Sequence, residues 1–189
     1  ESFKFLMDPM LQTGVEKVSA MGYGNAINAL SDNEGGVAKY FSQRFAQVTN
    51  PPLDSIREAD GMTLRVALGE KPHLGQSRSR QIVVNSPVLR MADMLKIKAQ
   101  SDTPWDRFDI LYSPDMSAPK GNERALLDAI DEVVAFARDR GGIAILSDRH
   151  LSRARAPIPM TLGVSAINQR LIEEGVRFKV SLVVESGQI

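Results

Sequence analysis

The clearest hydrophobic pattern lies in the second half of the chain, where continuous apolar runs alternate with longer amphipathic stretches. The amphipathic stretches, around residues 125–137 and 160–174, carry apolar residues at helical spacing and are followed by glycines. Apolar runs without alternation form strands buried on both faces, and intervening helices favour parallel pairing of such strands. We therefore predict a β-α-β-α-β unit over 108–186, with its strands in residues 108–112, 143–146 and 180–184.

The first half of the chain gives weaker patterns, which predict irregular helices. Apolar residues at helical spacing open the chain, and Gly14 is placed to end this first helix. Residues 20–36 hold so many turn formers that we expect a loop there. An aromatic-faced helix is expected over residues 37–48, and the sequence Asn50-Pro51-Pro52 stops it, because proline has no N–H.

Two further elements are expected before the β-α-β-α-β unit. Residues 62–68 and 81–84 predict a possible hairpin. A helix is expected over residues 87–98, with Ser86 as its N-cap and Pro87 in its first turn. Together with the later unit, these elements predict an α/β fold built on a parallel sheet.

The composition fits one soluble globular domain. The chain has 189 residues, of which 43% are hydrophobic and 24% are charged, and both fractions are close to the average for such proteins. Lysine plus arginine and aspartate plus glutamate both number 23, so the chain lacks the basic excess of a general nucleic-acid or anionic-membrane binder. We expect residues 1–189 to form a single domain with neither nucleic acid nor membrane as a partner.

Cysteine is absent and histidine occurs only twice, as His73 and His150. This excludes disulfides, thiolate nucleophiles and cysteine-ligated zinc or iron–sulfur sites within these residues. A metal site would have to be built from carboxylates, and we expect neither a metal site nor a catalytic residue here.

The two ends of the chain suggest a piece of a larger protein. The first residues hold no initiator methionine and no basic or apolar leader, so they predict a cytoplasmic setting, with the plastid stroma as the alternative. The last residues, Gly187-Gln188-Ile189, lie just past the final predicted strand, where parallel sheets carry functional loops. A free-standing domain would be expected to continue into a covering helix, so we expect a domain cut from a larger cytoplasmic enzyme.

Polar side chains follow the predicted strand at residues 143–146. Ser147, Asp148, Arg149 and His150 occupy the position where barrel enzymes place catalytic side chains. Triad members normally come from separate elements, so adjacent residues of one loop cannot easily form a Ser–His–Asp relay. The favoured interpretation is capping and ion pairing, with a bridge between Asp148 and Arg149, and a direct functional role is the alternative.

Other candidate positions stay open on physical grounds. Glu185 ends the final predicted strand, and Asp54 and Glu58 lie near the double proline, so each could act as an acid–base carboxylate. The glycines of residues 20–36 could cradle a phosphate, but neither of the two common phosphate-loop motifs is present. A turn-rich loop is the favoured interpretation there.

The segment FAQVTNPPLDSIRE, residues 45–58, places Thr49 and Asn50 between an aromatic helix and two prolines. Prolines fix the backbone, so the polar groups of these two residues are held in position rather than on a mobile tip. A simple helix stop, with Asn50 in a turn, is the favoured physical interpretation, and a positioned functional site is the alternative.

Several motifs in series resemble one family. The chain resembles the central domain of the large subunit of glutamate synthase, the NADPH- or ferredoxin-dependent enzyme. The resemblance runs from about residue 3 to the end and rests on AMG at 20–22, LSD at 30–32, FAQVTNPPLDSIRE at 45–58, NSPVL at 85–89, AILSDR at 144–149, API at 156–158 and VSLVVESG at 180–187. One departure is that residues 21–27 are MGYGNAI where the family commonly has a run like MGNDTP.

The resemblance implies a division of labour in a parent enzyme of glutamate biosynthesis and ammonia assimilation. A glutaminase domain with a cysteine nucleophile precedes the central domain, and an FMN domain with a 3Fe-4S cluster follows it. Ammonia from glutamine crosses an internal tunnel, and 2-oxoglutarate is aminated and reduced at the flavin. Partners are thus the glutaminase and FMN domains of the same polypeptide, and a small reductase subunit or ferredoxin.

For the central domain, the resemblance implies a (β/α) assembly like an incomplete TIM barrel, with a structural and ammonia-channel role and no cofactor of its own. The isolated segment is then expected to be inactive. Residues matched to the tunnel wall or an interdomain surface are Thr49, Asn50, Asp54 and Arg57, beside the strand-end residues Asp148, Arg149 and Glu185. The alternative is a free-standing α/β small-molecule-binding module or enzyme that uses the loops near Asp148 and Glu185.

Overall fold

The computed structural model describes residues 4, 7–15, 55–72, 81–100, 102–114 and 121–187. The chain divides into two units, Glu1–Leu53 and Asp54–Ile189. In the first unit, helix α1 (Asp8–Thr13) ends at Gly14, which adopts a left-handed conformation with φ of 67°. The predicted end of this helix is confirmed. The predicted loop at 20–36 and helix at 37–48 lie outside the described residues.

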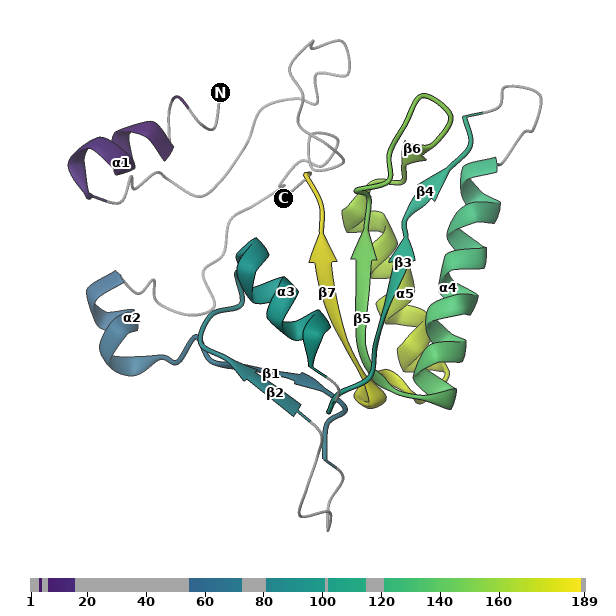
Figure 1. The fold of residues 1–189 in the computed structure, drawn as a ribbon, viewed down its shortest axis with the longest axis horizontal. Helices are drawn as coiled ribbons and strands as arrows, with labels where there is room; N and C mark the ends of the chain where they lie inside the picture. The colour runs from purple at the N-terminus through teal and green to yellow at the C-terminus, as the bar shows by residue number, and fades with distance from the viewer. Residues whose placement is uncertain are drawn as a thin grey trace, which may run out of the picture. The chain divides into compact units, whose positions relative to one another are not determined.

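The second unit is built on a parallel sheet of three strands in the order β3-β5-β7 (Figure 1). The strands are β3 (Trp105–Asp109), β5 (Gly142–Ser147) and β7 (Val180–Glu185). Helices α4 (Gly121–Asp139) and α5 (Met160–Glu173) connect them, so the predicted β-α-β-α-β unit is confirmed. Within the described residues the sheet does not close into a barrel.

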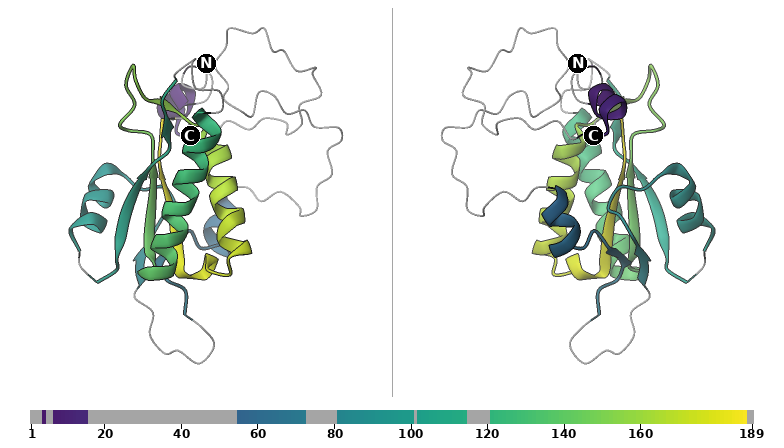
Figure 2. Two further views of the ribbon diagram at one scale, coloured as in Figure 1. Left: turned by 90° about the vertical axis from the view of Figure 1, so that its right-hand side faces the viewer. Right: turned by 90° about the vertical axis from the view of Figure 1, so that its left-hand side faces the viewer.

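The two faces of the sheet pack against different partners (Figure 2). Helices α4 and α5 cover one face, where Phe108, Leu146 and Val180 join their apolar residues in the larger core cluster. The other face carries Ile143, Ile145 and Val183, which pack with residues of a hairpin and of helix α3 (Met91–Ala99). Successive strand residues point to opposite faces, and the central strand β5 is buried along its whole length, as its unalternating sequence predicted.

The predicted hairpin is confirmed, with β1 (Val66–Gly69) antiparallel to β2 (Gln81–Val84), although β1 begins four residues later than expected. A short helix, α2 (Ser55–Gly61), precedes it. The hairpin contacts the sheet through Ser181, whose hydroxyl accepts from the Gly69 N–H and donates to the Gly69 carbonyl, both at 3.0 Å.

Helix α3 begins later than predicted. Its N-cap is Arg90, whose extended backbone has ψ of 162°, and the Asp93 side chain accepts a hydrogen bond from the Arg90 N–H. Ser86 instead accepts a hydrogen bond from the Val88 N–H and closes a turn ahead of the helix. The Ser86-Pro87 start was therefore wrong, because the Arg90–Asp93 pair supplies the stronger cap.

The first sheet strand also differs from the prediction. Strand β3 begins at Trp105, three residues before the expected start, and ends at Asp109. Its sequence, WDRFD, is mostly polar and lacks the apolar run that is typical of a strand buried on both faces. The chain then leaves the sheet, and β4 (Leu111–Tyr112) pairs antiparallel with β6 (Ala156–Pro157). A 3-10 turn, η3 (Arg177–Lys179), leads into β7.

Across the described ranges, no helix is both long enough and apolar enough to cross a membrane.

Candidate functional site

The carboxyl ends of the three sheet strands bring one polar residue each into a single row. Asp109 of β3 is in register with Ser147 of β5, and Ser147 is in register with Glu185 of β7. Two residues earlier in β5 and β7, Ile145 and Val183 belong to the cluster beneath α3, so the row lies on the α3 face. Functional loops of parallel α/β sheets gather at this end of the strands.

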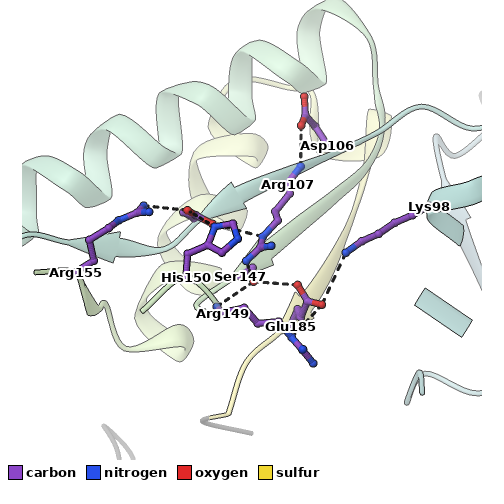
Figure 3. A network of polar contacts seen from close by, with 9 residues as sticks. Lys98, Asp106, Arg107, Ser147, Arg149, His150, Arg155 and Glu185 are labelled. Carbon is purple, nitrogen blue, oxygen red and sulfur yellow. Dashed lines mark hydrogen bonds and ion pairs between the residues drawn. The ribbon is translucent and has the colours of Figure 1, made fainter. Parts of the chain in front are cut away.

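Ser147 is the centre of the row, and its side chain is fully buried. Its hydroxyl donates to Glu185 Oε2 at 3.0 Å and accepts from Arg107 Nη2 at 2.9 Å (Figure 3). It also accepts from the Arg149 backbone N–H at 3.2 Å. A serine hydroxyl has one donor and two acceptor sites, so all three are used. The Ser147 hydroxyl is therefore saturated by partners within the protein, and its full burial keeps it from a substrate.

Glu185 is a buried carboxylate that two cations neutralise. Its Oε1 lies 3.2 Å from Arg149 Nε and 3.8 Å from Lys98 Nζ (Figure 3). Lys98 comes from α3 and lies 5.9 Å from the ring centroid of Trp105, whose indole N–H donates to the Lys98 carbonyl. A buried charge persists in a fold only when it is paired and hydrogen-bonded, and Glu185 meets both conditions.

Asp148 pairs with Ser186 rather than with Arg149, so the predicted bridge between Asp148 and Arg149 was wrong. Its carboxylate accepts from Ser186 Oγ at 2.5 Å, and its N–H donates to the Glu185 carbonyl at 3.3 Å. Arg149 pairs with Glu185 instead. The reason is the strand order, because β7 lies beside β5 and places Glu185 next to the loop that follows Ser147.

The other end of the row is an ion-pair cluster around Asp109. His150 Nδ1 lies 3.0 Å from Asp109 Oδ2, Arg155 Nη2 donates to the same oxygen at 2.9 Å, and Arg107 Nε lies 3.5 Å from Oδ1. His150 thus pairs with Asp109 rather than with Ser147 or Asp148, and no Ser–His–Asp relay forms. These contacts agree with ion pairing by this loop, but the partners are Asp109 and Glu185 rather than another residue of the loop.

The Asp109 cluster changes the acidity of its carboxyl group. Burial alone would raise the pKa of Asp109, but hydrogen bonds from His150 and Arg155 and the charges of His150 and Arg107 hold that pKa below its usual value. A depressed pKa in the folded state stabilises the fold above the unfolded pKa of about 3.9, and this contribution is lost as pH falls through the folded value.

Replacing Asp109 with asparagine is expected to lower the free energy of unfolding by about 1 kcal/mol at pH 7, because the pairs are partly exposed. The difference from the native chain should shrink as the pH falls below about 4, where the native carboxyl is protonated as well. Urea unfolding between pH 2.5 and 7 measures this. The exposed Asp128→Asn serves as the matched control, and a constant D109N difference over the whole range would contradict the expectation.

A cavity of about 490 Å³ adjoins Glu185 at the end of β7. Its walls come from β1, β2, α3, the segment before α3 and β7, and its polar members are Arg149, Glu185 and Ser186. A second hollow of about 870 Å³ lies between β2 and α3. Among the described residues, no group of three or more histidine, cysteine or acidic side chains is placed to hold a metal ion.

The sequence-predicted positions fall into two groups. Asp148, Arg149 and Glu185 come together in the strand-end network, with Arg149 and Glu185 in direct contact. Thr49, Asn50 and Asp54 lie outside the described residues, and Arg57 lies in α2 with its side chain outside them.

Sequence reasoning missed Lys98, Arg107 and Asp109. Asp109 carried a usable signal, because it ends a strand as Ser147 and Glu185 do. Its strand is mostly polar, WDRFD, whereas the apolar pattern predicts a strand that begins at residue 108 and continues past Asp109. The role of Lys98 depends on how α3 packs, which a local pattern does not give.

The fold and the strand-end row define an α/β domain in which charged side chains at the carboxyl ends of the parallel strands form ion pairs with one another. The family model described as the glutamate synthase central domain matches residues 1–189, and the chain belongs to this family. It is 35% identical to the glutamate synthase [NADPH] large chain of Bacillus subtilis (strain 168) over 98% of its own length, and 34% identical to the ferredoxin-dependent glutamate synthase of Cyanidium caldarium over all of it. The glutamate synthase [NADH] of Saccharomyces cerevisiae is 32% identical over the whole chain. The chain spans 12%, 12% and 9% of these three relatives.

Proposed function

We propose that this chain is the central connecting domain of a glutamate synthase large chain, with a structural and ammonia-channel role and no chemistry of its own. The observation that carries the proposal is the strand-end row. Its side chains bind one another, and the Ser147 hydroxyl has all of its hydrogen-bonding sites occupied. Asp109, Ser147 and Glu185 are committed to partners within the protein in this way, which suits a scaffold, whereas a catalytic site needs reactive groups aimed at a substrate.

The parent enzyme would convert glutamine, 2-oxoglutarate and reductant into two glutamates in the cytoplasm or plastid stroma. Its FMN and 3Fe-4S cluster would be held by other domains of the polypeptide, and the 189 residues do not fit a cluster because they offer no thiolate. The named relatives use NADPH, ferredoxin and NADH, which supports a central domain that does not select the electron donor. All 189 residues would act as one domain, with an incomplete TIM barrel around the three-strand sheet.

The ammonia-channel role assigns Thr49 and Asn50 to the tunnel wall, with Asp54 and Arg57 in the wall or at a domain boundary. The support is the match of residues 45–58 to the family and the double proline that fixes the backbone beside them. A tunnel needs a wall that keeps ammonia from bulk water, and rigid turns suit that purpose.

Replacing Thr49 or Asn50 with tryptophan in the full-length enzyme is expected to uncouple glutamine hydrolysis from glutamate formation. A bulky side chain would obstruct the passage, so ammonia would escape to solvent, while activity with added ammonia would persist. The ratio of glutamine hydrolysed to glutamate formed measures the effect. The exposed Thr161→Trp on α5 is the matched control, and unchanged coupling in both tunnel variants would remove these residues from the channel.

A free-standing small-molecule enzyme or binding module remains the second candidate, because the cavity beside Glu185 offers space at the functional end of the sheet. This function predicts that the purified chain binds a flavin or a phosphate-bearing ligand, visible by absorbance or calorimetry. The parent open reading frame separates the two candidates. If that reading frame encodes a glutaminase domain with a cysteine nucleophile upstream and an FMN domain with a 3Fe-4S cluster downstream, only the connecting-domain function remains.

A further inference from the structure

The cavity at the end of β7 is built as a small-molecule pocket. Its volume of about 490 Å³ falls within the usual range for such sites, and most of its wall is apolar, including Leu68, Met94 and Leu182. The few polar members gather at one end, around Arg149 and Glu185. This combination of an apolar body and convergent polar groups is typical of ligand sites, and the carboxyl ends of parallel strands are where α/β folds place them.

Arg149 brings unused hydrogen-bonding capacity to this cavity. Its Nε faces Glu185 Oε1 at 3.2 Å, and its side chain is 52% exposed. In the described part of the chain the guanidinium makes this ion pair but no hydrogen bond. A guanidinium carries five N–H donors in a rigid, planar fork, so Arg149 is held by one side and can donate from the other.

Glu185 does not need the remaining donors of Arg149. Arg149 and Glu185 are the charged residues given for the cavity wall, and Lys98, which lies outside that wall, also pairs with Glu185. Glu185 is also held by the Ser147 hydroxyl, so its carboxylate is occupied on both oxygens. The neighbouring carboxylate of Asp148 binds Ser186 and does not line the cavity.

We propose that this cavity binds a small organic carboxylate with an apolar body, and that Arg149 receives the carboxylate. Arginine binds carboxylates through two parallel N–H···O bonds, which suits the free side of this guanidinium. The aliphatic part of the ligand would lie against the walls from β1, α3 and β7. The inference does not rest on the connecting role, because it uses only the cavity and its charges.

Saturation-transfer difference NMR on the full-length polypeptide tests this site with isovalerate as the probe and neutral isovaleramide as its comparison. Isovalerate should bind, and isovaleramide should bind at least about tenfold more weakly, since it lacks the charge that Arg149 recognises. Arg149→Met should weaken isovalerate binding at least about tenfold. The matched control is Arg153→Met, in the same loop with an exposed side chain, which should leave binding unchanged.

A second variant separates loss of the site from loss of the fold, because Arg149 also pairs with Glu185. Val88 lines the cavity and its side chain is 79% exposed, so a tryptophan at this position should not disturb the core. The larger side chain should fill the cavity and abolish isovalerate binding. Binding that survives both Arg149→Met and Val88→Trp would overturn the proposal. So would an absent signal in the native polypeptide. That result would leave the connecting role standing, because the ratio of glutamine hydrolysed to glutamate formed tests that role separately.

Discussion

Replacing Gly142 with alanine is expected to lower the free energy of unfolding by at least about 3 kcal/mol. Gly142 begins the central strand with φ of 113°, a conformation that side-chain-bearing residues rarely adopt. A Cβ built there would lie 2.1 Å from the Pro104 carbonyl oxygen. That oxygen accepts a hydrogen bond from the Ile143 N–H at 2.9 Å, so it cannot move away without disturbing the pairing of β3 and β5.

Gly175→Ala provides the matched control for this prediction. Gly175 also has a positive φ, of 68°, but a Cβ there would meet nothing within 4 Å. Its replacement should cost only the conformational penalty of about 1 kcal/mol. Urea unfolding of both variants separates the two contributions, and an equal loss in the two would show that the contact with Pro104 does not decide the result.

The second half of the fold could be predicted from the sequence because its elements are buried on consistent faces. The β5 run is apolar at every position from Ile143 to Leu146, and α4 places its apolar residues at helical spacing, so local pattern and tertiary burial agree. The glycine pair after α4 was expected to end the helix. That Gly142 also faces a carbonyl across the sheet depends on β3, which no local pattern reveals.

The candidate site could be predicted only in part, for a related reason. Asp148, Arg149 and Glu185 stood out because they follow buried strands, and the structure brings them together. Their partners depend on the strand order β3-β5-β7, which puts the β5 loop beside β7 and turns Arg149 to Glu185. Arg107 comes from β3, whose mostly polar sequence gives no strand pattern.

Replacing Glu185 with leucine is expected to lower the free energy of unfolding by about 2–3 kcal/mol. The substitution removes the acceptor of the buried Ser147 hydroxyl and the counter-charge of Lys98 and Arg149. Removing one partner of a fully buried ion pair costs about 3–5 kcal/mol. The loss here should be smaller, because the side chains of Lys98 and Arg149 are 25% and 52% exposed and can turn toward water.

Glu185→Gln divides this loss into its charge and hydrogen-bond contributions. Glutamine keeps an oxygen for the Ser147 hydroxyl, so only the charge pairing is lost and the cost should fall to about 1 kcal/mol. Glu132→Gln on the exposed face of α4 should change stability by less than about 0.5 kcal/mol. Urea unfolding at low and high salt completes the test. The loss of stability in Glu185→Gln should be similar at both salt concentrations, since a buried pair is screened little by salt. If Glu185→Leu unfolds at the same urea concentration as the native chain, the contacts of Glu185 do not stabilise the sheet.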